Sequence, residues 1–285
     1  LNILDNTYKI EFRPLTDEEW VPYSPKAEML GMYELFDEII VPKIFINNNM
    51  VHLPTLKTHG HTKTTGAIKN AFGGLIPKYR HHSHKILDEV LVDLVAIQKE
   101  IHPGLLAVMD GTVAGNGAGP RTMEPYYSNL LLASEDQVAI DAVAAHLMGF
   151  DPFTIKYLKL AHDKGLGTAD LDQIEIVGME REKYNQTNFH FTTKKSLVIK
   201  WDQRIRKTTY RHKVLKPLHW LFFYSPMFRL FIFSSYVFHD LIWYPTVGKK
   251  NVKKFFATDW GTLFNQYPYG ERTKNFPKIK NWNPY

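Results

Sequence analysis

The 285-residue chain contains no cysteine. This absence excludes disulfide bonds, thiolate catalysis and cysteine-ligated iron–sulfur clusters within the chain. Any metal would have to be held by His, Asp or Glu. With 44% hydrophobic and 22% charged residues, the composition is that of a globular protein. The length suits one large domain, or one domain with an appendage.

Acidic residues are scarce in the last third of the chain. Residues 1–180 carry 15 Lys and Arg against 24 Asp and Glu, a net charge of −9. Residues 181–285 carry 20 against 5, a net charge of +15. We therefore divide the chain into an α/β ligand-binding domain, 1–180, and a basic, aromatic C-terminal extension, 181–285. The extension is expected to face a surface that attracts positive charge.

The chain also lacks a long, uninterrupted apolar run. Residues 218–244 contain eleven aromatic side chains, but Pro226, Arg229 and Asp240 interrupt them, whereas a membrane-spanning helix needs about 20 apolar residues. Aromatic residues flanked by Lys and Arg favour the interface of an anionic membrane, or a groove on a membrane partner protein. The alternatives are a helical cap over the body and a true span. Nucleic acid is a weaker candidate, because the aromatic residues are clustered rather than interleaved with the charges.

Strand and helix signals alternate through the first 180 residues. The patterns predict strands at 49–53, 105–109, 129–133 and 174–177, and helices at 64–72, 83–101, 138–148 and 152–163. This alternation predicts an α/β fold with a mostly parallel sheet flanked by helices. The chain starts without Met and without a turn or cap signal, so we expect a missing segment upstream. From Gly270 onward the sequence predicts irregular structure.

Residues 53–74, LPTLKTHGHTKTTGAIKNAFGG, combine Lys, His, Thr and Gly. We expect the preceding strand to bring Lys57 and His59 to the carboxyl edge of the sheet, where open α/β folds bind ligands. Thr64 and Thr65 then precede a predicted helix start, whose free N–H groups suit an anion. We expect an anion in this turn, with Lys69 adding charge. A polar loop that faces water fits the same composition, and no Walker GxxxxGK[ST] motif is present.

Two further patterns add candidates. His59 and His61 have the spacing that places both on one side of a strand, so they could hold a divalent metal; exposed histidines are the alternative. In MDGTVAGNGAGPRT, 109–122, Asp110 is expected to end a strand, and Gly117 to lie in a loop that lets the backbone approach a ligand. Asp141 has small and apolar helical neighbours, so it is a candidate buried carboxylate.

The chain resembles the family called "domain of unknown function 362" in five segments that occur in the same order and at similar spacing. They are LPTLKTHGHTKTTGAIKNAFGGLIP, the Lys/His-rich stretch after it, VMDGTVAGNGAGP, ASEDQVAIDAVAAHLMGFDP and AHDKGLG. The resemblance covers roughly residues 38–178. It implies an α/β fold and a site, but no established reaction. Many relatives carry ferredoxin-like iron–sulfur domains, which this cysteine-free chain lacks. The positions carried over are Lys57, His59, Lys69, Asn70, Asp110, Gly117, Pro120, Asp136, Asp141, Gly149 and Pro152.

Together these patterns favour an enzyme at a membrane surface that binds a small anionic or phosphorylated ligand. A divalent metal is a candidate cofactor at the same site. We assign catalytic roles to Lys57, His59, Lys69 and Asp141. Ligand binding is assigned to Thr64, Thr65, Asn70, Asp110 and Gly117, and a metal to His59 and His61. The alternative function is a non-catalytic cofactor-binding or carrier module that docks a membrane redox partner. In either case we expect a cytoplasmic protein associated peripherally with a membrane.

Overall fold

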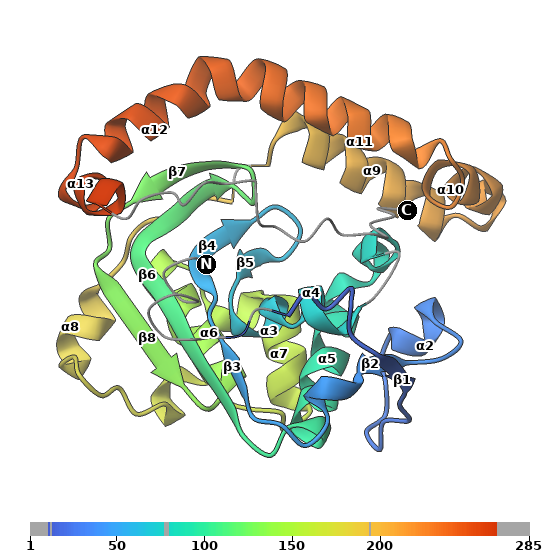
Figure 1. The fold of residues 1–285 in the computed structure, drawn as a ribbon, viewed down its shortest axis with the longest axis horizontal. Helices are drawn as coiled ribbons and strands as arrows, with labels where there is room; N and C mark the ends of the chain where they lie inside the picture. Colours follow the sequence, from blue (N-terminus) through green and yellow to red (C-terminus); the bar gives the residue numbers. More distant parts are fainter. Residues whose placement is uncertain (1–10, 12, 77–79, 194, 267–285) are drawn as a thin grey trace.

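The computed structural model describes residues 11, 13–76, 80–193 and 195–266. A six-stranded sheet forms the centre, and helices flank it and cross one of its ends (Figure 1). The predicted α/β class with a C-terminal helical extension is confirmed. The irregular tail expected from residue 270 and the start of the chain, 1–10, lie outside the described residues. The strands of the sheet are β3 (Met50–His52), β4 (Thr55–His59), β5 (Lys63–Thr65), β6 (Leu105–Ala118), β7 (Thr122–Tyr126) and β8 (Leu130–Ser134).

Strand β6 organises the sheet. Strands β3 and β4 pair with it in parallel, whereas β7 and β8 pair with it antiparallel, and β5 pairs antiparallel with β4. The parallel centre, β3–β6–β4, is therefore extended by three antiparallel strands. Two short strands, β1 (Trp20–Pro22) and β2 (Ile40–Pro42), form a separate sheet beside this centre.

The glycine-rich segment is strand, not loop. We expected the strand to end at Asp110, but β6 continues through Gly111, Gly115 and Gly117 to Ala118. Its second half is held between β4 and β7, so its backbone hydrogen bonds are satisfied by neighbouring strands. A side chain would not fit at Gly119, just beyond the strand, because a Cβ there would lie 2.1 Å from the carbonyl oxygen of Thr58. The glycines let strands approach one another.

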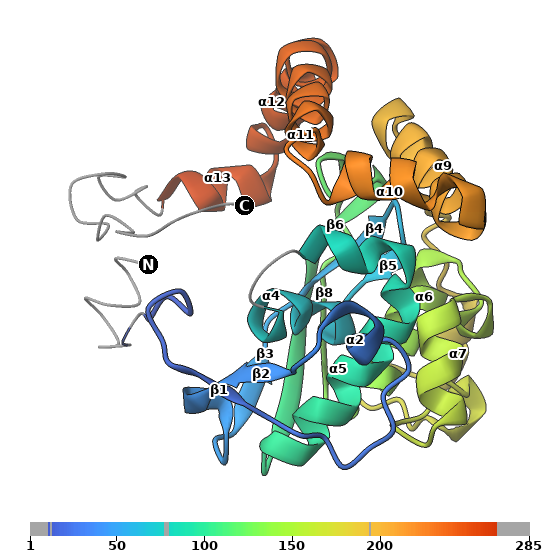
Figure 2. The ribbon, with the colours of Figure 1, turned by 90° about the vertical axis from the view of Figure 1, so that its right-hand side faces the viewer.

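Helices α5, α6 and α7 pack on one face of the sheet (Figure 2). Helix α5 carries the apolar period predicted for 83–101, although it begins only after the 3₁₀ turn η2. Asp136 caps α6 by accepting hydrogen bonds from the N–H groups of Val138 and Ala139. The strand predicted at 174–177 is wrong: this segment is irregular. The helices of the body are α2 (Met32–Leu35), α3 (Ala67–Asn70), α4 (Phe72–Leu75), α5 (Leu87–Ile101), α6 (Gln137–Met148), α7 (Lys156–Asp163) and α8 (Arg181–Gln186), with 3₁₀ turns η1 (Lys43–Phe45), η2 (Arg80–Lys85), η3 (Pro152–Thr154) and η4 (Leu171–Gln173).

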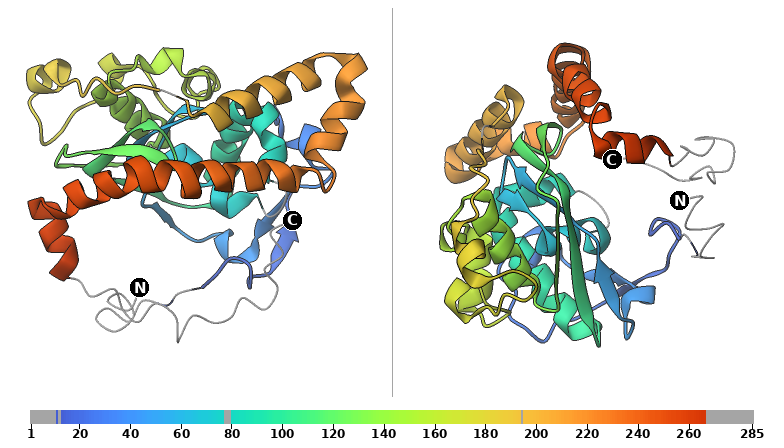
Figure 3. Two further views of the ribbon diagram at one scale, coloured as in Figure 1. Left: turned by 90° about the horizontal axis from the view of Figure 1, so that it is seen from above. Right: turned by 90° about the vertical axis from the view of Figure 1, so that its left-hand side faces the viewer.

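The C-terminal extension crosses the end of the sheet where β4 and β6 finish (Figure 3). A continuous helix, Phe228–Phe256, passes over β7 and beside α9. Among the described residues no single helix is long and apolar enough to cross a bilayer. In the described part of the chain, one pair of helices, Lys213–Phe223 and Phe228–Phe256, bent by 62°, together meets the length and composition of a span. The elements of the extension are α9 (Leu197–Arg211), η5 (Lys213–Leu215), α10 (Lys216–Phe223), α11 (Phe228–Tyr236), the π-helix η6 (Val237–Gly248), α12 (Lys249–Phe256) and α13 (Asp259–Gln266).

Helix α3 is fixed to α6 by a buried carboxylate. Asp141, 2% exposed, accepts hydrogen bonds from the N–H groups of Ala67 at 2.7 Å and Ile68 at 3.2 Å. Gly66 makes room for it, because a Cβ there would lie 2.0 Å from Asp141 Oδ1. A helix of four residues has little stability of its own, so this contact holds α3 in place.

We therefore predict that Gly66→Ala destabilises the protein by about 2 kcal/mol or more, because the added methyl group displaces the Asp141 carboxylate. Gly73→Ala is the matched control, since a Cβ at Gly73 meets no atom within 4 Å. It should change stability by about 0.5 kcal/mol or less. Urea unfolding of both variants measures the difference, and equal stabilities would refute the packing argument.

Candidate functional site

Strand β4 places three of the motif residues at the carboxyl edge of the sheet. Thr58 and His59 are buried, and Lys57 is partly exposed. The Thr58 hydroxyl donates to the carbonyl oxygen of Gly117 at 2.8 Å. Gly117 has a φ of +104°, the left-handed region that favours glycine. The close backbone approach that we expected of Gly117 toward a ligand is made here toward β4.

Lys69, on α3, lies close enough to Lys57 for their charges to interact. Burial, with the charge of Lys57 contributing, lowers the pKa of Lys69 to about 8. Its Nζ lies 5.2 Å from the ring centre of Phe72. Among the described residues, neither lysine forms an ion pair with a carboxylate. Two ammonium groups without a counter-charge create a local positive potential, which attracts an anion.

Three neutral imidazoles adjoin these lysines. Burial, together with the charge of Lys69, lowers the pKa of His59 to about 2. Burial likewise lowers the pKa of His61 to about 4, and that of His84 well below its usual value. The rings of His61 and His84 stack with centroids 4.6 Å apart. We call these five residues, Lys57, His59, His61, Lys69 and His84, the Lys–His cluster.

The histidine geometry gives the predicted metal pair no support. The rings of His59 and His61 are 5.8 Å apart, and the Nδ1 atom of His59 accepts a hydrogen bond from the backbone N–H of His61 at 3.2 Å. Nδ1 of His61 accepts from Gln203 Nε2 at 3.1 Å. Within the described parts of the chain, no group of three or more His, Asp or Glu is arranged to hold a metal ion.

The remaining predicted residues have their own partners. The Thr64 hydroxyl is buried and shares a hydrogen bond of 2.8 Å with Tyr157, and Thr65 lies opposite Lys57 in the β4–β5 ladder. The Asn70 amide lies 3.2 Å from Nδ1 of His52. Asp110 is exposed and accepts hydrogen bonds from the N–H and hydroxyl of Thr112. The Lys–His cluster therefore forms without these side chains.

Asp141 occupies the place where we expected an anion. Its carboxyl oxygens accept hydrogen bonds from the first N–H groups of α3, so the chain itself supplies the acceptor at this helix start. Burial raises the pKa of Asp141 to about 7, although the two N–H donors oppose that rise. This geometry makes Asp141 an anchor for the helix that carries Lys69.

Helix α9 covers the cluster, and sequence patterns did not identify its residues. Gln203 Nε2 donates to the carbonyl oxygen of Gly60 at 2.9 Å as well as to His61. Arg206 is 2% exposed, forms an ion pair with Asp202 at 2.9 Å and donates to the carbonyl oxygen of His81 at 3.1 Å. The only local signal was the spacing of Asp202 and Arg206, which suits a helical ion pair.

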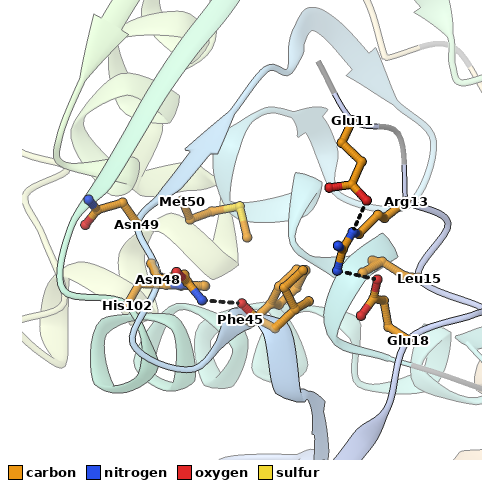
Figure 4. A pocket seen from close by; sticks show the side chains of 10 residues that line it. Glu11, Arg13, Leu15, Glu18, Phe45, Asn48, Asn49, Met50 and His102 are labelled. Carbon is orange, nitrogen blue, oxygen red and sulfur yellow. Dashed lines mark hydrogen bonds and ion pairs between the residues drawn. The ribbon is translucent and has the colours of Figure 1, made fainter. Parts of the chain in front are cut away.

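A separate pocket of about 590 Å³ lies near the N-terminal end of β3 (Figure 4). Arg13 in its wall is paired with Glu11 at 2.7 Å and with Glu18 at 3.8 Å. Its position is at the opposite strand end from the Lys–His cluster, away from the edge where open sheets bind ligands. The pocket is lined by Glu11, Arg13, Leu15, Glu18, Ile44, Phe45, Asn48, Asn49, Met50 and His102.

Comparison with known proteins supports the resemblance found in the sequence. The family model described as "Domain of unknown function (DUF362)" matches residues 3–146, half of the chain. A thylakoid-associated protein of Synechocystis sp. (strain ATCC 27184 / PCC 6803 / Kazusa) is 33% identical over 157 residues. These residues are 54% of this chain and 47% of that relative, so the chain spans about half the relative's length. No solved structure matches.

The raised pKa of Asp141 predicts how stability depends on pH. In the folded state the Asp141 carboxyl group keeps its proton up to about pH 7, whereas in the unfolded state it releases the proton near pH 4. The unfolded state therefore binds fewer protons between these values, so this group's contribution to the free energy of unfolding falls as pH rises from about 4 to 7. Asp141→Asn should remove this component. Urea unfolding of both proteins at several pH values tests it, and parallel curves would exclude the raised pKa.

Proposed function

We propose that this chain, which belongs to the domain of unknown function 362 family, binds a small anionic ligand at the Lys–His cluster and acts as an enzyme at a membrane surface. The observation that carries the first part is the pair Lys57 and Lys69. Two partly buried ammonium groups beside neutral imidazoles have no carboxylate partner among the described residues. A phosphate or carboxylate group of a ligand would supply the missing charge.

Lys69 gives the site a group suited to proton transfer. An amine with a pKa of about 8 exchanges protons near neutral pH, which is the property required of a general acid or base. His59 stays neutral over the same range and offers an uncharged ring beside the bound anion. This chemistry favours the enzyme over the alternative, a carrier that holds a charged cofactor for a membrane redox partner. Turnover of a bound ligand distinguishes the two.

The outer side of the extension supports the membrane part of the proposal. The long helix exposes large apolar side chains, including Phe233 at 63% and Leu241 at 57%. Exposed lysines follow at 249, 250, 253 and 254. Exposed apolar side chains beside basic residues suit the surface of an anionic bilayer. The name of the thylakoid-associated relative agrees with membrane association. The cytoplasmic location stays a prediction.

We predict that Lys57→Ala or Lys69→Ala weakens sulfate binding about tenfold, because each variant loses one charge-assisted contact. Sulfate keeps a single charge state across neutral pH, so a change in its affinity with pH reports the titration of groups on the protein. Binding to the parent should weaken as pH rises through about 8, where Lys69 loses its proton, and Lys69→Ala should lack that step. Isothermal titration calorimetry measures both effects.

Lys63→Ala is the matched control for this experiment. Lys63 belongs to the same hairpin, but it is exposed and its Nζ donates to Thr154 at 3.1 Å. Its removal should leave the sulfate affinity unchanged. Equal affinities for all four proteins would eliminate the Lys–His cluster as the anion site.

For the membrane, we predict binding to vesicles that contain phosphatidylglycerol, weaker binding as salt rises, and little binding to phosphatidylcholine alone. Phe233→Asp should lower the affinity for these vesicles at least about tenfold, since it removes a large apolar contact and adds charge repulsion with the anionic lipid. Val177→Asp, at a body position that is 83% exposed, is the control and should bind like the parent. Sedimentation with vesicles measures the bound fraction. Binding that resists salt and requires detergent for release would contradict a peripheral mode.

A further inference from the structure

Helix α9 closes directly over the turn that follows β4. Ile199 packs so tightly there that a Cβ on Gly60 would lie 2.7 Å from Ile199 Cδ1. Gln203 binds the carbonyl oxygen of Gly60 and the ring of His61. With α9 in this position His59 is only 6% exposed. Helix α9 therefore closes the His61 side of the Lys–His cluster.

Helices α9 and α10 are joined into one unit. The guanidinium carbon of Arg206 lies 3.9 Å from the ring centre of Phe223, which is 1% exposed. The hydroxyl of Thr209 on α9 lies 2.9 Å from Nδ1 of His219 on α10. Because these contacts are buried and span both helices, α9 cannot leave the body without carrying α10 along.

Besides Gly60 and His61, this unit and the residues that follow it contact the turn η2 of the body. Tyr224, directly after α10, stacks on His82 with ring centroids 3.9 Å apart, and Phe228, at the start of α11, stacks on His81 at the same separation. Arg206 donates to the carbonyl oxygen of His81. These are ring contacts and single hydrogen bonds rather than a continuous strand ladder, so they can be released together at moderate cost.

The opposite side of the same two helices faces outward. Trp201 on α9 is 59% exposed and Trp220 on α10 is 61% exposed. Arg204 lies 5.9 Å over the Trp201 ring, and lysines 200, 207, 213 and 216 are exposed around them. One face therefore closes the ligand site, and the other has the Trp and basic residues that suit an anionic membrane surface.

We propose that α9 and α10 form a lid over the Lys–His cluster, and that binding to an anionic membrane opens it. This inference rests on the proposed function and adds its regulation. A bilayer shifts the lid only if it binds the open state more tightly. The inner residue Ile199 supplies that difference, because it packs against Gly60 and becomes available to the apolar interface only when the lid leaves the body. Membrane attachment thus opens access to the anion site.

The absence of cysteine makes the lid measurable with one introduced thiol. Ile199→Cys places a thiol in the closed contact, and its reaction rate with a maleimide reports how often the lid opens. Val92→Cys, at a position in α5 that is 1% exposed, reports opening of the body instead. Phosphatidylglycerol vesicles should raise the rate at Ile199→Cys about tenfold and leave the rate at Val92→Cys unchanged. Sulfate should slow the reaction at Ile199→Cys, since a bound anion favours the closed lid.

Each failure has a separate meaning. If the protein sediments with the vesicles but the Ile199→Cys rate is unchanged, the lid is not coupled to the membrane and the inference is overturned. If rates at both positions rise together, the vesicles loosen the whole fold, which also overturns it. Absence of vesicle binding defeats the membrane part of the proposed function and the lid with it. A vesicle effect without a sulfate effect retains the lid, and calorimetry of Lys57→Ala and Lys69→Ala then decides the anion site separately. Adding Phe233→Asp to Ile199→Cys should remove the vesicle effect.

Discussion

The carboxylate of Asp141 at the start of α3 is the contact on which the position of the site depends. Helix α3 has four residues and carries Lys69, yet so short a helix has little stability of its own. Two hydrogen bonds from its first N–H groups to a carboxylate on α6 tie it to the best-buried part of the body. A buried carboxylate is costly without such donors. Each group thus satisfies the other, and Lys69 is held beside Lys57.

The electrostatics of the site are local rather than global. Residues 1–180 carry a net charge of −9, but exposed charges are screened over about 8–10 Å at ordinary salt. Within that distance the Lys–His cluster contains two lysines and three imidazoles that burial keeps neutral. The acidic body therefore keeps a positive site at the sheet edge. Because the imidazoles add no charge, Lys57 and Lys69 supply the positive charge of the cluster.

The extension has two sides with different chemistry. Its inner side buries Ile199 and Arg206 against the body, whereas Phe223 is buried within the extension. Its outer side exposes tryptophan, phenylalanine and lysine. The cap and the membrane interface, which the sequence presented as alternatives, are thus compatible, because inward contacts make the extension a cap while large apolar and basic side chains are exposed on it among the described residues. The boundary near residue 180 separates an acidic part of the chain from a basic part. It does not separate the Lys–His cluster from the extension, because Gln203 on α9 contacts Gly60 and His61.

Local sequence patterns determined the elements whose stability is local. The apolar period of α5, the run that becomes α6, the strands predicted at 105–109 and 129–133, and the charge division could all be taken from neighbouring residues. The family was recognised by the resemblance of five segments spread over residues 38–178. The segment 174–177 shows the limit, because an apolar alternation becomes a strand only if a partner strand lies beside it. The course of β6 through its glycines likewise depended on pairing with β4 and β7. Only the tertiary structure showed that Asp141 anchors α3, and that Gln203 covers Gly60 from 143 positions away along the chain. Such contacts leave no periodic trace in the sequence, because each residue's partner is chosen by the packing of whole elements rather than by its neighbours.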